Sequence, residues 1–250
     1  MKKKNTVKMV CAAAAVLICL FVSVGFVIAS QEHRAEMSVE EAQISDTLLA
    51  GLDIEAQHGV IPAEMLSAEP GQKGIIALSE NESKQLSDTL KSELSKYYSV
   101  SEVERISGLG DRTLEEVRSR AIGEQGGAVS GDITVRSGVC NFYCSDIKVD
   151  GTAAQASSTY VYWIICVEPG EKEKNVGKWQ TTLIISRWDG EYTLEKIDGK
   201  WLITGTGKLM QEFAPDDYDR VKGVYNTFEE ALTAAEEIDP ETENPWKAVP

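Results

Sequence analysis

The sequence predicts an α+β protein, with an N-terminal transmembrane helix followed by helices packed on a curved antiparallel sheet. Two observations predict this class. Apolar residues recur at helical spacing between residues 86 and 122, and from residue 133 they alternate with polar residues at the period of a strand. Three Asp-Gly pairs then punctuate the strand-like runs, and consecutive strands joined by tight turns must be antiparallel. The helices are therefore expected to precede the sheet.

An uncharged run of 22 residues, 9–30, follows a basic start at residues 1–8. A helix rises about 1.5 Å per residue, so this run can cross a hydrocarbon core of roughly 30 Å. Lysines before the run and acids after it orient the N-terminus toward the cytoplasm. A cleaved signal peptide with its site at Val27-Ile28-Ala29 is the alternative, and it would give a secreted protein. The apolar run is longer than that of an ordinary signal peptide, which favours a single-pass signal-anchor.

The charge is divided between the two sides of this run. The chain has a formal net charge of −15, and residues 1–30 carry four lysines and no acid, so the other 220 residues carry −19. An exported body with this charge repels phosphate backbones, which argues against nucleic-acid binding. A hydrophobic content of 42% and a charged content of 26% fit a globular acidic protein and not a disordered one.

Residues 31–78 are predicted to form a stalk or linker. A capping box at Ser38 precedes a short helix, and its apolar positions have helical spacing. Five Gly and Pro residues between Gly59 and Gly74 then interrupt the pattern. The apolar positions of the short helix are Ile44, Leu48, Leu49 and Leu52.

Three helices are expected at the start of the folded domain. A capping box at Ser79 begins the first, and its apolar residues fall on one face. A second short helix is expected at residues 102–106, and a third from a capping box at Thr113 to Gly123. The face of the first helix consists of Leu86, Leu90, Leu94 and Tyr97.

Five or six strands should follow, because Asp-Gly pairs at residues 150, 189 and 198 separate the runs. The second pair marks either a tight turn or a bulge within one long strand. The expected strands begin around Ile133 and cover residues 139–149, 152–167, 179–188, 192–197 and 200–210. Residues 213–250 are expected to form an acidic C-terminal helix, capped by Thr227, and a polar tail.

The hairpin from Tyr192 to Ile203 has the pattern Y-x-L-x-K-x-D-G-K-W-x-I. With the preceding helices, it resembles the nuclear transport factor 2-like (SnoaL-like) superfamily over residues 79–212. The resemblance implies a cone-like α+β domain that encloses a pocket between helix and sheet. Some members are enzymes, some bind ligands and many mediate assembly, so the fold alone does not settle activity.

Histidine and cysteine offer little catalytic chemistry. His33 and His58 both lie outside residues 79–212, so the histidine-based sites of this superfamily lack their residue inside the domain. Cys140 and Cys144 are expected on one face of a strand about 13 Å apart, beyond the reach of a disulfide. Either could pair with Cys166, but three buried free thiols are favoured. Three cysteines without histidine make a poor zinc site, and we expect no metal and no cofactor.

A carboxylate site of the ketosteroid isomerase kind would need an acid and tyrosines inside the cone. The candidates are Asp132, Asp146, Tyr143, Tyr160 and Tyr162. The favoured interpretation is that Asp146 lies on the surface of a strand and that the tyrosines pack the sheet. No residue is therefore assigned to catalysis or to ligand binding.

These observations favour a membrane-anchored, extracytoplasmic binding or assembly domain that is not an enzyme. Its expected partners are the membrane, through residues 9–30, and another protein. A short cytoplasmic start, one span and a cone-like outer domain resemble, in architecture, the inner-membrane scaffold components of type IV secretion and conjugation machines. The alternative is an exported lyase or isomerase with a carboxylate and tyrosine site in the cone.

Overall fold

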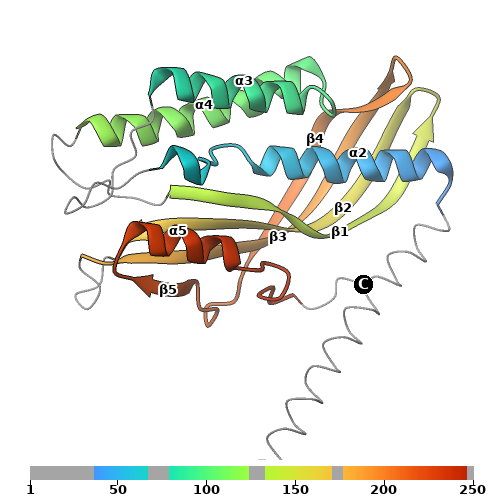
Figure 1. The fold of residues 1–250 in the computed structure, drawn as a ribbon. Coiled ribbons are helices and arrows are strands. Elements are labelled where there is room, and N and C mark those ends of the chain that lie inside the picture. Colours follow the sequence, from blue (N-terminus) through green and yellow to red (C-terminus); the bar gives the residue numbers. More distant parts are fainter. Residues whose placement is uncertain (1–36, 67–78, 124–132, 171–176, 247–250) are drawn as a thin grey trace, which may run out of the picture. The chain divides into compact units, whose positions relative to one another are not determined.

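The computed structural model describes residues 37–66, 79–123, 133–170 and 177–246 (Figure 1). Residues 43–249 form one compact unit, and residues 37–42 belong to a separate N-terminal unit. The predicted transmembrane segment, residues 9–30, lies outside the described residues. Within the described ranges, no helix combines the length and the apolar character that a membrane span requires.

The described strands form an antiparallel sheet of five, in the order β1-β2-β3-β4, with β5 also paired to β3. Helices pack on this sheet, which confirms the predicted α+β class with an antiparallel sheet. The strands are β1 Ile133–Asp150, β2 Ala153–Pro169, β3 Trp179–Ile197, β4 Lys200–Phe213 and β5 Val221–Tyr225.

The Asp-Gly pairs have two different roles. Asp198 and Gly199 both have positive φ, 51° and 79°, as a two-residue type I′ hairpin turn requires. Asp189-Gly190 instead lies inside β3, which runs unbroken from residue 179 to residue 197. The prediction of one long strand is therefore correct and the predicted turn is wrong, but the register shift after Gly190 places the extra residue on β4, between Thr206 and Leu209.

Three bulges in β1 change which face its side chains occupy. The register with β2 shifts between Cys140 and Tyr143, where Asn141 has a φ of 49°. The extra residue turns the following side chains to the other face of the sheet. Cys140 is therefore opposite Val161 and Cys144 opposite Ser158, on opposite faces. The expectation that both cysteines share a face is wrong, but the prediction that all three are buried outside any disulfide is confirmed.

The helices are α2 Val39–Ala56, the 3-10 turn η1 Ala63–Met65, α3 Glu80–Leu94, α4 Val100–Gly123 and α5 Phe228–Glu237. The capping boxes predicted at Ser79 and Thr227 are present. The box predicted at Thr113 is not, because the Thr113 hydroxyl donates to the Leu109 carbonyl inside α4. Residues 102–106 and 113–123 thus belong to one helix. Its Gly110 lets Leu90 of α3 approach, since a Cβ there would lie 3.1 Å from Leu90 Cδ2.

Helix α2 packs against the sheet, although its sequence was assigned to a stalk. Ile44, Leu48 and Leu52 are buried in a cluster with residues of β3 and β4. The Ser137 hydroxyl on β1 donates to the Ala56 carbonyl at 2.6 Å, which fixes the C-terminal end of α2 to the sheet. The apolar stripe recognised in the sequence is therefore covered by the sheet.

The C-terminal segment covers the face of β2 opposite Tyr160. Buried residues of α5, including Phe228, pack in one cluster with Ile165, Trp179 and Leu183. On β1, Arg136 donates to the carbonyls of Ala235, Glu236 and Ile238 at 2.8, 3.0 and 3.1 Å. A cation at this position satisfies the last carbonyls of the helix. The predicted acidic helix and tail thus supply a strand and part of the core.

Candidate functional site

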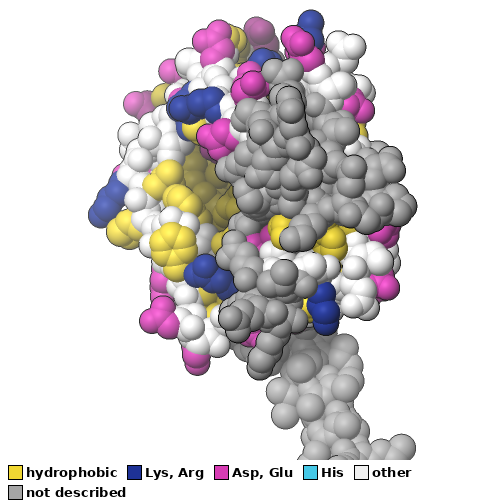
Figure 2. Space-filling model, turned by 90° about the vertical axis from the view of Figure 1, so that its left-hand side faces the viewer, with side chains coloured by type: hydrophobic (Ala, Val, Ile, Leu, Met, Phe, Trp, Pro, Cys, Tyr) yellow, Lys and Arg dark blue, Asp and Glu magenta, His cyan; other side chains and the backbone are white. Residues whose placement is uncertain are grey.

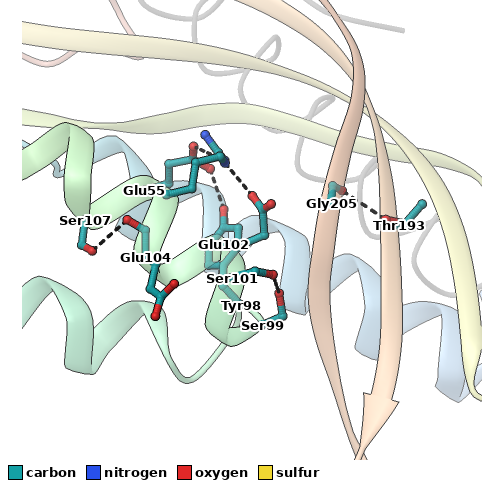
Figure 3. Close-up of polar contacts among 10 residues, drawn as sticks. Glu55, Tyr98, Ser99, Ser101, Glu102, Glu104, Ser107, Thr193 and Gly205 are labelled. Atoms are coloured by element: carbon teal, nitrogen blue, oxygen red, sulfur yellow. Dashed lines mark hydrogen bonds and ion pairs between the residues drawn. The ribbon is translucent and has the colours of Figure 1, made fainter.

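A carboxylate and a tyrosine meet between α2 and the turn that joins α3 to α4 (Figure 3). The Tyr98 hydroxyl donates to Glu55 Oε2 at 2.7 Å. The other carboxylate oxygen, Oε1, lies 3.5 Å from Arg105 Nη2, and Arg105 Nε donates to Glu102 at 2.8 Å. Tyr98 is only 2% exposed, whereas Arg105 is exposed to solvent. The network therefore runs from the core to the surface.

Further tyrosines line the core beside Tyr98. The hydroxyls of Tyr160 on β2 and Tyr192 on β3 lie 3.3 Å apart, and both side chains are buried. Burial raises the pKa of Tyr98 well above its ordinary value, and the nearby Glu55 carboxylate raises it further. Burial also raises the pKa values of Tyr160 and Tyr192. These phenols are accordingly neutral hydrogen-bond donors at physiological pH.

This geometry favours a structural role for the network. A general base must reach a substrate proton, directly or through one water. Both carboxylate oxygens of Glu55 already have partners within the protein, and the tyrosines beside it are buried. The contacts join α2, α4 and the turn between α3 and α4, so they hold the helical layer together.

Only part of the predicted site coincides with this network. Asp132 lies outside the described residues, and Asp146 is exposed in a β1 bulge, as the favoured interpretation expected. Tyr160 lies in the core beside Tyr98, and Tyr162 is half-buried near it, with a pKa that burial raises to about 12. Tyr143 lies on β1 and is also half-buried.

Sequence reasoning missed the acid of this network because α2 was assigned to a stalk. One signal could have found it: Glu55 continues the stripe of Ile44, Leu48 and Leu52 at helical spacing. A second acid on the same helix, Asp53, accepts the Val139 backbone N–H at 3.0 Å and so holds α2 to β1.

The histidines and acids show no metal site in the described part of the chain. The His58 ring nitrogen Nδ1 lies 2.7 Å from the Glu55 backbone carbonyl, and His33 lies outside the described residues. Across the described ranges, no three His, Cys, Asp or Glu side chains are grouped to hold a metal ion.

The first half of β4 is covered on its outer edge. The Ile203 N–H donates to the Tyr97 carbonyl at 2.8 Å, and the Ser99 N–H donates to the Ile203 carbonyl at 2.9 Å. Trp201 and Ile203 are buried in the cluster that contains α2. Trp201 and Ile203 therefore belong to the core, and the outward backbone groups of Ile203 are paired.

The second half of β4 is uncovered, and we call residues 207–213 the open edge. Leu209, Met210 and Phe213 are 43%, 51% and 60% exposed. The Ala214 N–H donates to the Ile185 carbonyl of β3, and hydrogen-bonding direction alternates along an antiparallel strand. The backbone N–H and C=O groups of Leu209, Gln211 and Phe213 therefore point away from β3. No backbone partner for them lies within the described part of the chain.

Two other surface features are hollows. A groove of about 560 Å³ lies at the hairpin ends of the sheet, and Lys148, Asp150, Leu194 and Thr204 contribute to its lining. Figure 2 shows another face, on which hydrophobic side chains gather in a hollow flanked by charged side chains. Contiguous exposed apolar surface of this kind often marks a site of interaction.

Comparisons with known proteins add little to these observations. No protein-family model and no curated protein matches the chain. The structure is similar to that of a calcium/calmodulin dependent protein kinase II association domain from Xanthomonas campestris, at 15% identity. The match covers 60% of this chain and 99% of that one, with a TM-score of 0.21. A likeness at this level carries no argument, so membership of the nuclear transport factor 2-like superfamily stays a prediction.

Proposed function

We propose that this chain is a membrane-anchored extracytoplasmic domain that binds or assembles with protein and is not an enzyme. The observation that carries the proposal is the open edge of β4. Natural proteins usually protect an edge strand with charges, prolines or a covering element, because exposed backbone groups recruit another strand. This edge carries two charged residues, Lys208 and Glu212, but Leu209, Met210 and Phe213 are exposed beside its outward backbone groups. A strand edge that combines both features is suited to a protein partner.

The state of the interior supports the same proposal. Glu55 has its carboxylate oxygens engaged by Tyr98 and Arg105, and the tyrosines around it are buried. A binding surface on the outside of the sheet needs no opening of this core.

The anchor is part of the proposal and rests on the sequence. Residues 9–30 cross the membrane once, with the N-terminus in the cytoplasm and residues 31–250 outside. The cone-like, nuclear transport factor 2-like domain would then present the open edge to other parts of a secretion or conjugation machine. Recovery from the medium of a chain that starts at Ser30 would contradict the anchor and favour a secreted protein.

Site-specific photocrosslinking tests the binding surface. A photoreactive amino acid is placed at Met210 in the full chain, expressed in cells, and the matched control carries it at Asp88, an exposed residue of α3. We expect covalent protein adducts from position 210 and none from position 88. If positions 209, 210 and 213 all give no adduct, the proposed function is wrong.

The alternative function, an exported lyase or isomerase, is favoured by one observation, the hydrogen bond from Tyr98 to Glu55. Such a site would have to open next to Tyr160 to admit a substrate. Saturable binding of para-nitrophenol, weakened by both Tyr98→Phe and Tyr160→Phe, would support this alternative. The absence of saturable binding would argue for the structural role.

A further inference from the structure

We infer that the open edge pairs with the same edge of a second copy of this chain, antiparallel and centred on Met210. The inference rests on the proposed assembly function and names its partner. A twofold pairing of this kind is self-complementary, because each residue meets its counterpart about one axis. The two five-stranded sheets would then continue into each other through β4.

The backbone of the open edge permits this pairing. The outward N–H and C=O groups belong to Leu209, Gln211 and Phe213, by the alternation set at Ala214. Centred on Met210, Leu209 of one copy forms a hydrogen-bonded pair with Gln211 of the other. The regular ladder does not extend to Gly207, because a register shift puts an extra β4 residue between Thr206 and Leu209. The two Met210 residues form a non-hydrogen-bonded pair, whose Cα atoms lie about 4.5 Å apart.

The charges select this register over its neighbours. Lys208 of each copy is directly opposite Glu212 of the other, which gives two opposite-charge pairs. A register centred on residue 208 would oppose two lysines, and one centred on residue 212 would oppose two glutamates. In registers centred on residue 209 or 211, Lys208 would not be opposite Glu212. Only the register centred on Met210 brings both charge pairs together.

The apolar side chains agree with the same register. Leu209 and Phe213 point to the same face as Ser186 and Trp188, because residues directly opposite in the β3–β4 ladder share a face. Pairing therefore removes three large exposed apolar side chains, Leu209, Met210 and Phe213, from water in each copy.

Cysteine crosslinking in the full chain tests the register. Met210→Cys should give a disulfide-linked species of twice the chain mass under mild oxidation, because a Cα separation of about 4.5 Å is within disulfide reach. Lys208→Cys is the matched control, since four residues of offset put its two copies about 13 Å apart. The wild-type chain, with Cys140, Cys144 and Cys166 buried, controls for the native thiols.

Charge reversal tests the same register without new thiols. Lys208→Glu and Glu212→Lys should each weaken self-association roughly tenfold, because two attractive pairs become repulsive. Mixing the two variants should restore association as a heterodimer, and both substitutions in one chain should restore the homodimer. The readout is sedimentation equilibrium of the full chain in a mild detergent, at low salt. A general loss of folding would not be restored by mixing.

The outcomes separate this inference from the proposed function. If Met210→Cys crosslinks no faster than Lys208→Cys, or if mixing restores nothing, pairing with a second copy is wrong. Photocrosslinks from position 210 to a protein of another mass would then still support an assembly function with a different partner. No disulfide from Met210→Cys, together with no photoadduct from positions 209, 210 and 213, would contradict both.

Discussion

The two halves of β4 differ in what lies beyond their outer edge. In the first half, Trp201 and Ile203 are buried, and Tyr97 and Ser99 satisfy the outward backbone groups of Ile203. The half from residue 207 to residue 213 pairs with β3 on its inner side and exposes Leu209, Met210 and Phe213. The first part of β4 thus contributes to the core, and its last part is exposed at the surface. The difference teaches that a neighbouring segment, more than strand composition, decides which part of a sheet can bind a partner.

The largest difference in stability is expected when one apolar side chain is truncated in each half of β4. We expect Ile203→Ala to lower the free energy of unfolding by about 3 kcal/mol, because it leaves a cavity in the core. The matched change Leu209→Ala should alter it by less than about 0.5 kcal/mol, since an exposed side chain loses little packing. Urea denaturation of the full chain, at a concentration where it is monomeric, measures both. Equal losses would show that the open edge is buried in the monomer.

The next largest effect is expected at alkaline pH, which should destabilise the core that contains Ile203. Burial raises the pKa of Cys144, in the cluster around Ile203, to about 12 from an ordinary value of 9.0. Burial raises the pKa of Tyr162 to about 12 and the pKa of Tyr98 well above 10.0. These groups ionise first in the unfolded chain, so their stabilisation is complete below about pH 8 and is lost as pH rises toward their folded pKa values.

We therefore expect these groups to lower the unfolding free energy by about 2 kcal/mol between about pH 8 and about pH 10, and Cys140, whose pKa burial also raises to about 12, to lower it by about 1.4 kcal/mol more. Urea denaturation over this range measures the change, and Cys144→Ala should reduce it. A stability that stays constant to pH 11 would mean that these side chains are solvated.

Tyr98→Phe removes a hydrogen bond from the segment that covers Ile203. We expect a loss of about 1.5 kcal/mol, because Glu55 Oε2 loses its hydrogen-bond donor. Tyr97→Phe is the matched control, since the Tyr97 side chain is only half-buried and its backbone carbonyl still caps Ile203. Thermal and urea denaturation measure both variants. A loss as large for Tyr97→Phe would assign the effect to packing of the rings.

The smallest effect is expected at the outer end of the same network. Arg105→Gln breaks the ion pairs with Glu55 and Glu102, but the guanidinium is exposed, so we expect a loss below about 1 kcal/mol. The difference from the wild type should shrink as salt is added, because salt screens exposed charges. A loss that exceeds that of Tyr98→Phe would place the main support of Glu55 at the arginine.

Local signals in the sequence predicted much of the fold. Side-chain caps at Ser79 and Thr227, the type I′ turn at Asp198-Gly199 and the alternation along the strands each depend on a few neighbouring residues. Such features are determined by short-range sterics and hydrogen bonding, so the sequence shows them directly.

The features that were missed depend on contacts far apart in the chain. Residues 43–56 became a core helix because β3 and β4 cover its apolar stripe, and nothing adjacent in sequence indicates that cover. The bulge at Asn141 puts Cys140 and Cys144 on opposite faces of the sheet, although asparagine is not the usual signal for a bulge. Glu55 and Tyr98 are 43 residues apart, so no pattern of neighbouring residues indicates the hydrogen bond between them.

The contacts of Arg136 with the end of α5 have a consequence for biosynthesis. The arginine and Ile238 are 102 residues apart, and ribosomes add about 5–20 residues per second. Only 55 of these residues follow Leu183, so for roughly 3 to 11 s the nascent sheet exposes Trp179 and Leu183 without the helix that covers them. During that interval an apolar face is open to chaperones or to aggregation. Slower growth at low temperature, or co-expression of a holdase, should accordingly raise the yield of soluble folded domain.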